Sequence, residues 1–185
     1  MIYSPLEQFN IITLIPLHTG NVYYSFTNSS LYMLLVVGLV LSLFQMVTAE
    51  GGRIVPSRWQ SVVGMIYTFV CDLVEGQVGK AGRAYFPFIF TVFSFVLFSN
   101  LIGMVPYSFT VTSHFVVTFG LSISLFIGLT LIGIYTHGLH FLSFFWPSGA
   151  PIAMAPLLVV LEIVSYCFRP LSLGVRLFAN TVSYT

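Results

Sequence analysis

Three charged side chains lie inside the apolar C-terminal part of this chain, and their spacing would bring them together on a helix. Glu162, Arg169 and Arg176 are seven residues apart in turn. Each step of seven drifts by only about 20° around a helix, so all three would share one face. A charge at the bilayer centre costs about 2.5 to 3.5 kcal/mol, so such side chains face a protein interior or a water-filled path. The pattern predicts a proton or ion path.

Polar neighbours extend this face. Asn180 follows Arg176 by four residues, and Ser165 and Ser172 lie near the same stripe. Pro170 is expected to kink the helix, which makes the alignment approximate.

Other roles are open for two of the charges. Glu162 and Arg169 could neutralise each other as a structural pair, and Arg169 could extend to the membrane interface. Arg176 lies between Val175 and Leu177, seven residues from the nearest other charge. A partner on another chain is therefore expected for Arg176.

Two further residues are candidates for lining the path. His114 begins an apolar run, and imidazole can relay protons, although a position among the lipid headgroups is the alternative. Asn100 lies in the apolar run before it. His137 and His140 have the spacing of a metal pair but no third ligand nearby, so neither a metal nor a cofactor is predicted.

The composition indicates a membrane protein. Of the 185 residues, 57% are hydrophobic and 6% are charged, against about 25% charged in a soluble domain. A net charge of +1 gives no reason to expect a nucleic-acid partner.

The elements that must position the charges are predicted to be helices of one membrane domain, 1–185. Charge-free apolar runs at 31–48, 85–105 and 115–135 are long enough to span a bilayer. Residues 1–30 are polar and turn-rich, and they are predicted to form an external arm that can include a short interfacial helix. Residues 150–185 would carry the charged path.

Residues 57–80 form an amphipathic pattern. Its apolar residues recur every three or four positions: Trp59, Val62, Val63, Ile66, Val70, Leu73 and Val74. Ser61, Thr68, Asp72 and Glu75 lie on the other face. The pattern predicts an interfacial helix; a true span with two acids near its end is the alternative.

The stretch from Arg169 to Asn180, RPLSLGVRLFAN, closely resembles subunit a of F-type ATP synthases, as does the preceding stretch from Ala155 to Ser165. Residues 99–109 more loosely resemble the mitochondrial and alphaproteobacterial branch of this family, and residues 4–9 resemble mitochondrial forms. The resemblance implies an all-α membrane protein with transmembrane helices, an interfacial helix and long tilted intramembrane helices. The implied location is the mitochondrial inner membrane, or alternatively a bacterial plasma membrane.

The resemblance also implies a mechanism and partners. Arg176 matches the arginine that faces the carboxylates of a ring of c subunits, and Glu162 and Asn180 match polar positions near the ring. The chain would pass protons to and from that ring to drive ATP synthesis. Nucleotide chemistry would belong to partner subunits, and other membrane-sector and peripheral-stalk subunits and the lipid bilayer would surround the chain.

The chain departs from the family in two respects. The family continues with a further long helix, and Thr185 stands where the family has a titratable His or Glu. The resemblance therefore predicts a truncated, split or intron-interrupted chain, for which a non-conducting membrane anchor is the alternative function. A haem-binding electron carrier is disfavoured because the histidines lie at span ends. An intramembrane hydrolase lacks a nucleophile with its base.

The basic residues predict the orientation. Arg53, Arg58, Lys80 and Arg83 all lie between the first two spans, so the positive-inside rule places residues 50–84 in the matrix or cytoplasm. A Ser57→Cys variant should react with an impermeant thiol reagent from that side only. Reaction only from the opposite side would contradict this topology.

Overall fold

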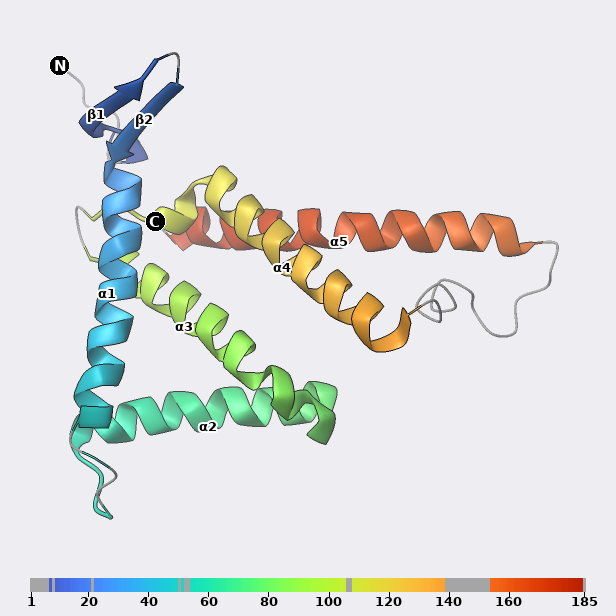
Figure 1. Ribbon diagram of the computed structural model, residues 1–185, viewed down its shortest axis with the longest axis horizontal. Helices are drawn as coiled ribbons and strands as arrows, with labels where there is room; N and C mark the ends of the chain where they lie inside the picture. Colours follow the sequence, from blue (N-terminus) through green and yellow to red (C-terminus); the bar gives the residue numbers. More distant parts are fainter. Residues whose placement is uncertain are drawn as a thin grey trace. The chain divides into compact units, whose positions relative to one another are not determined.

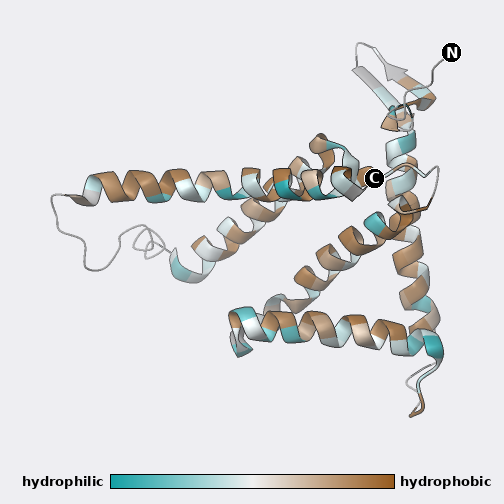
Figure 2. Ribbon diagram, turned by 180° about the vertical axis from the view of Figure 1, so that it is seen from behind, coloured by the Kyte–Doolittle hydropathy of each residue, from teal (hydrophilic) through white to brown (hydrophobic). Residues whose placement is uncertain are grey.

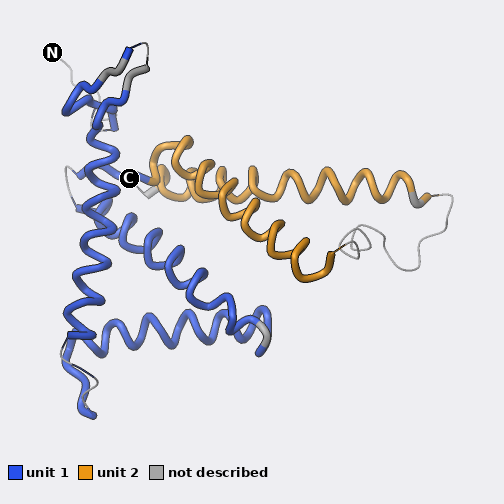
Figure 3. Tube along the Cα trace, viewed as in Figure 1, with its two compact units in different colours: residues 1–111 blue, residues 112–185 orange. Residues whose placement is uncertain are grey.

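The computed structural model describes residues 7, 9–20, 22–49, 51, 54–105, 108–138 and 154–184. They belong to two compact units, residues 1–111 and residues 112–185, which are described separately (Figure 3). In chain order the elements are β1 Thr13–Thr19, β2 Val22–Thr27, α1 Asn28–Ala49, α2 Arg58–Val78, η2 Lys80–Tyr85, α3 Phe86–Gly103, η3 Val111–Ser113, α4 Phe115–His137 and α5 Ala155–Tyr184 (Figure 1).

The helices have the length and composition of membrane helices. Within the described ranges, five helices are long and apolar enough to cross a bilayer. They include α1, α3 and α4, which coincide closely with the predicted spans. A helix pairs its backbone N–H and C=O groups with one another, and hydrocarbon offers these groups no other hydrogen-bond partner. Hydrophobic residues cover most of these helices, with hydrophilic residues interspersed along α5 (Figure 2). The predicted all-α membrane class is confirmed.

The N-terminal region differs from the expectation. Strands β1 and β2 pair antiparallel over Thr13–Thr27, in place of the short interfacial helix that the arm was expected to allow. The first residue of the connecting turn, Gly20, has φ of 64°, which glycine adopts without strain. The runs on either side of Gly20-Asn21 are rich in β-branched and aromatic residues, which favour strands. Residues 1–6 of the predicted arm lie outside the described residues.

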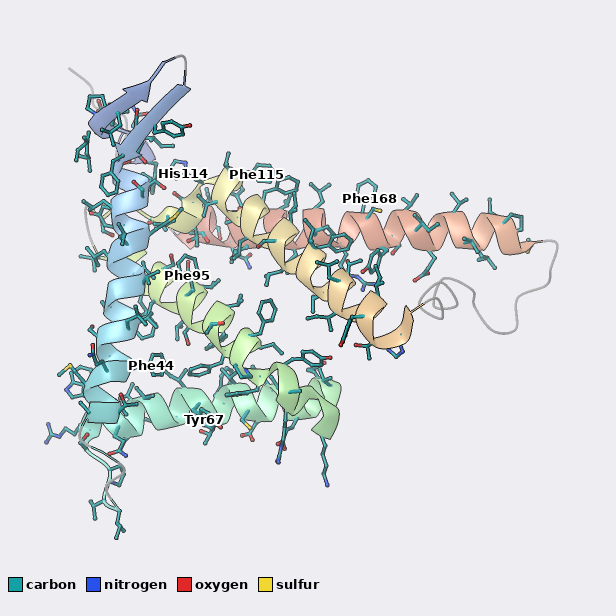
Figure 4. The ribbon with its side chains drawn as sticks, viewed as in Figure 1. Phe44, Tyr67, Phe95, His114, Phe115 and Phe168 are labelled. Carbon is teal, nitrogen blue, oxygen red and sulfur yellow. The ribbon has the colours of Figure 1, made fainter. Side chains whose placement is uncertain are left out.

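Aromatic side chains join the three helices of the first unit. Phe90 of α3 lies 5.5 Å from Phe44 of α1 and 6.0 Å from Tyr67 of α2, between ring centroids. Tyr67 also lies edge-on to Phe86 at 4.8 Å. Such pairs add about 0.5 to 1.5 kcal/mol each beyond their buried area. Phe44 and Tyr67 thus mark the meeting point of α1, α2 and α3 (Figure 4).

The corner between α2 and α3 is fixed by two glycines and an ion pair. Gly79 ends α2 with φ of 78°. A Cβ at Gly82 would lie 2.8 Å from Val78 Cβ, so the turn packs directly on α2. Arg83 donates from Nε and Nη2 to Glu75 Oε1, at 2.6 and 2.5 Å. Glu75, one of the two acids of α2, is therefore used in holding this corner.

The apolar stripe of α2 divides into two parts. Val70 and Val74 are buried, but Trp59 and Leu73 are exposed, at 61% and 44%. The exposed part of the stripe is available to lipid. Among the candidate spans α2 has the lowest mean hydropathy, 1.2. An interfacial position for α2 stays a prediction.

A spin label measures the depth of α2 directly. A label at Thr68→Cys, which is exposed, should report a shallow position because the helix carries Asp72 and Glu75. Leu39→Cys, in the middle of α1, is the matched control and should report a deep position. Oxygen and nickel accessibility of the two labels gives the depth. A Thr68 label at the bilayer centre would show that α2 crosses the membrane.

Candidate functional site

Helix α5, which carries the predicted path, is continuous from Ala155 to Tyr184 despite Pro170 in its interior. Proline has no N–H, so the Tyr166 carbonyl loses its usual partner four residues on. Thirty helical residues extend about 45 Å, longer than the roughly 30 Å hydrocarbon core. A helix of this length fits inside a bilayer only if it is strongly tilted. Residues 150–153 and Thr185 of the predicted 150–185 segment lie outside the described residues.

One face of α5 packs on α4 in an antiparallel arrangement (Figure 1). Near the start of α4, Phe115 meets Phe178 edge-on at 5.8 Å. Further along, Ser122 donates a hydrogen bond to the Pro170 carbonyl. This hydrogen bond joins the two helices at Pro170, where the backbone hydrogen bonds of α5 are interrupted.

Small residues bring the two helices close together at Gly174. A Cβ at Gly174 would lie 3.3 Å from Phe119 Cα and 3.4 Å from Ser122 Cβ. Thr118 and Ser122 are almost fully buried, at 1% and 2% exposure. Helices in lipid associate through such close packing and through hydrogen bonds, because apolar surface gains little there by leaving lipid.

Tyr166 contacts both helix α4 and Arg169, a member of the charged face of α5. Its ring lies 4.8 Å from Phe126, between centroids, and its hydroxyl is 2.8 Å from Thr130 Oγ1. Thr130 donates its own proton to the Phe126 carbonyl at 2.7 Å, so Tyr166 is the donor to Thr130. The Arg169 guanidinium lies over the same ring, 5.5 Å from its centroid. A cation in this position is attracted to the ring face.

The predicted polar residues lie on the side of α5 away from α4. At about 100° per residue, Tyr166, Pro170, Gly174 and Phe178 share one face, and the charges lie roughly 120° around the helix from it. Glu162 is half-buried. The remaining members of this polar face are exposed: Ser165, Arg169, Ser172, Arg176 and Asn180.

The described residues do not pair these charges with one another. Arg169 lies over Tyr166, so the suggested structural pair with Glu162 is not formed. Neither Glu162 nor Arg176 makes an ion pair with any residue that the structure describes. A counter-charge for Arg176 would have to come from outside the described part of the chain.

The two other candidates belong to elements other than α5. His114 is the N-cap residue of α4 in the second unit. Its side chain is half-buried, and its carbonyl accepts from the amides of Val117 and Thr118 at 3.1 and 3.2 Å. Figure 4 shows it beside Phe115. Asn100 is half-buried in α3 and belongs to the first unit. Their roles stay predictions.

The residues that hold the polar face in place were missed in the sequence. Thr118 and Ser122 are polar residues four apart in an otherwise apolar run, and Gly174 is four residues from Pro170. Small and hydroxyl-bearing residues at this spacing mark helix contacts in membranes. The spacing of residues gave no comparable indication for Tyr166, because its contact with α4 depends on Thr130, which only the fold brings close to it.

Apolar helices with an ionisable face on one of them define an α-helical integral membrane protein. Comparison with known proteins is more specific. A family model described as the ATP synthase A chain matches residues 30–183. The chain belongs to the ATP synthase A chain family.

Curated relatives agree with this assignment. The chain is 60% identical to ATP synthase subunit a of Marchantia polymorpha, over 99% of this chain and 74% of that protein. It is 57% identical to subunit a of Oenothera berteroana, over 98% and 66%, and 55% identical to subunit a-2 of Arabidopsis thaliana, over 97% and 53%. The chain thus spans between about half and three quarters of the length of these relatives.

The contact at Gly174 can be tested by enlarging it. Gly174→Leu should separate α4 from α5 and lower the free energy of unfolding by about 1 to 3 kcal/mol, since there is no room for the new side chain. Gly128→Leu in α4, where a Cβ meets nothing within 4 Å, is the control and should change stability by less than about 0.5 kcal/mol. Unfolding of both variants in detergent gives the comparison. Equal stability of the two would show that Gly174 does not lie at a close contact.

Proposed function

We propose that this chain is the proton-conducting subunit a of the membrane sector of an F-type ATP synthase. The observation that carries the proposal is the polar face of α5, with Glu162, Arg169, Arg176 and Asn180 directed away from α4. The family membership and the names of the relatives support the same function. Protons would pass along this face to and from carboxylates on a ring of c subunits, and their flow would drive rotation and ATP synthesis.

Arg176 would act as a fixed positive charge. A guanidinium stays protonated at physiological pH, and a positive charge beside a carboxylate favours the ionised carboxylate. A ring carboxylate that comes to Arg176 would therefore release its proton. The same charge would repel a proton that approached directly from the other half of the path. The exposure of Arg176 and the lack of an ion pair with any described residue support a partner on another subunit.

Glu162 would relay protons to or from the ring at a distance from Arg176. The two residues are 14 positions apart, or about 21 Å along a straight helix, too far for direct neutralisation. A carboxylate and a guanidinium separated in this way can serve different steps. Asn180, one turn beyond Arg176, would orient the guanidinium or the ring carboxylate by hydrogen bonding.

The remaining assignments follow from this role. The chain would not be an enzyme by itself, because it holds no Gly-rich phosphate loop with Lys and Ser or Thr. Nucleotide chemistry would belong to partner subunits. We place the chain in the mitochondrial inner membrane, in contact with the c ring and with other membrane-sector and peripheral-stalk subunits.

Replacement of Arg176 in the assembled synthase is the decisive test. Arg176→Ala should lower proton-driven ATP synthesis by at least about 100-fold, which corresponds to roughly 3 kcal/mol of lost electrostatic stabilisation. Arg176→Lys should also be severely impaired, since lysine is a compact charge that loses its proton more readily when buried. Glu162→Gln should give a smaller loss. The measurements are ATP synthesis and passive proton leak in membrane vesicles.

Assembly must be measured in the same membranes. The Arg176 variants should assemble normally, because the side chain is exposed and makes no ion pair with any residue that the structure describes. Arg58→Ala, which removes an exposed arginine of α2, is the matched control and should synthesise ATP at the normal rate. Normal coupled synthesis by Arg176→Ala would refute the proposed mechanism.

A further inference from the structure

The hairpin of β1 and β2 has an apolar face that the described residues leave uncovered. Ile15 pairs with Phe26 and Leu17 pairs with Tyr24. Side chains two apart on a strand, and their cross-strand partners, point to the same side of a sheet. Ile15, Leu17 and Tyr24 are 53%, 56% and 61% exposed. These four side chains are called the apolar hairpin face.

The other face of the hairpin is different. Pro16 pairs with Ser25 there, and Ser25 is half-buried. Tyr24 and Ser25 are neighbours on one strand but point to opposite sides of the sheet. They therefore offer a matched pair of positions for telling the two faces apart.

A two-stranded sheet of this kind needs a surface to lie on. An isolated hairpin is at best marginally stable in water, and independent stability needs more strands or packing against another element. Among the described residues, the main contact of the hairpin outside its own strands is between β2 and α1. The exposed apolar side chains indicate that the missing support covers this face.

The hairpin is joined firmly to the end of α1. The Asn28 side chain donates to the Asn10 carbonyl at 3.0 Å and accepts from the Ile12 amide at 3.3 Å. The Asn28 backbone amide donates to the Ile12 carbonyl at 3.1 Å. Ser30 Oγ accepts from the Thr27 amide and donates to the Thr27 carbonyl. These bonds hold the strands against the first turn of the helix.

The length of α1 places this junction at the membrane surface. Its 22 residues extend about 33 Å, close to the roughly 30 Å thickness of the hydrocarbon core. The first residue of α1, Asn28, therefore lies at the level of the headgroups. The strands continue from that end of the helix, obliquely to its axis (Figure 1).

We propose that the apolar hairpin face rests on the lipid headgroup region of the bilayer, on the side opposite residues 50–84. The occupant is the lipid surface because the hairpin is continuous with a helix that spans the membrane. No Asp, Glu, Lys or Arg occurs between Glu7 and Glu50, so no such charge would have to leave water when the face rests on the bilayer. Tyr24, a member of this face, is of a residue type that is enriched at membrane interfaces.

Spin labels at the paired positions test the proposal. In the full chain with Cys71→Ser and Cys167→Ser, reconstituted into phosphatidylcholine vesicles, single labels are placed by Tyr24→Cys and Ser25→Cys. The Tyr24 label should show an oxygen-to-nickel accessibility ratio several-fold above that of the Ser25 label. Leu17→Cys, across the sheet from Tyr24, should behave like Tyr24→Cys.

Equal accessibility at Tyr24 and Ser25 would overturn the proposal, whether both labels were in water or both in lipid. Water exposure of Tyr24 in vesicles, with protection only in the assembled synthase, would identify a protein partner and also overturn it. A second measurement needs no substitution. A photoreactive group on the lipid headgroup should label the apolar hairpin face of the unmodified chain, that is Ile15, Leu17, Tyr24 and Phe26, and labelling confined to the helices would count against the proposal. Neither measurement depends on proton transport.

Discussion

Hydrocarbon cannot solvate a charge, and the arrangement of α5 follows from that constraint. Glu162, Arg169 and Arg176 would each be costly to expose to lipid tails. The helix gathers them on one side, where a single polar surface can serve all three. Arg169 receives partial compensation from the Tyr166 ring. Arg176 receives none from any residue that the structure describes, which makes it the charge that most needs a partner from elsewhere.

A polar face is useful only if it is held in a fixed direction, and α4 supplies that support. The contact at Gly174 and the hydrogen bonds from Ser122 and Tyr166 all lie on the packed face of α5, about 120° around the helix from the charges. Close backbone approach and hydroxyl bonds replace the hydrophobic effect as the cause of helix association in lipid. Pro170 fits into this scheme, since its carbonyl is a hydrogen-bond acceptor for the neighbouring helix.

The first unit uses other means to connect its helices. Aromatic pairs around Phe90 join α1, α2 and α3. The pair of Arg83 with Glu75 fixes the corner between α2 and α3 with groups that retain access to solvent, since the two side chains are 68% and 35% exposed. At the far end of α1, the junction at Asn28 fixes the hairpin by backbone and amide hydrogen bonds. An ion pair thus holds the corner between α2 and α3, and uncharged polar groups hold the junction between the hairpin and α1.

The sequence by itself determined the membrane class, the helices and the common face of the charges. Apolar runs of about 20 residues leave few alternatives to a helix in lipid, and a seven-residue spacing aligns side chains on any continuous helix. The hairpin was missed because its strands are short and depend on cross-strand pairing. The tertiary structure alone decided which side of α5 packs on α4, because that choice depends on Thr130, Ser122 and Phe119, about 36 to 55 residues away in the chain. Local spacing reports which residues share a face, but only contact with a second helix determines which face is covered.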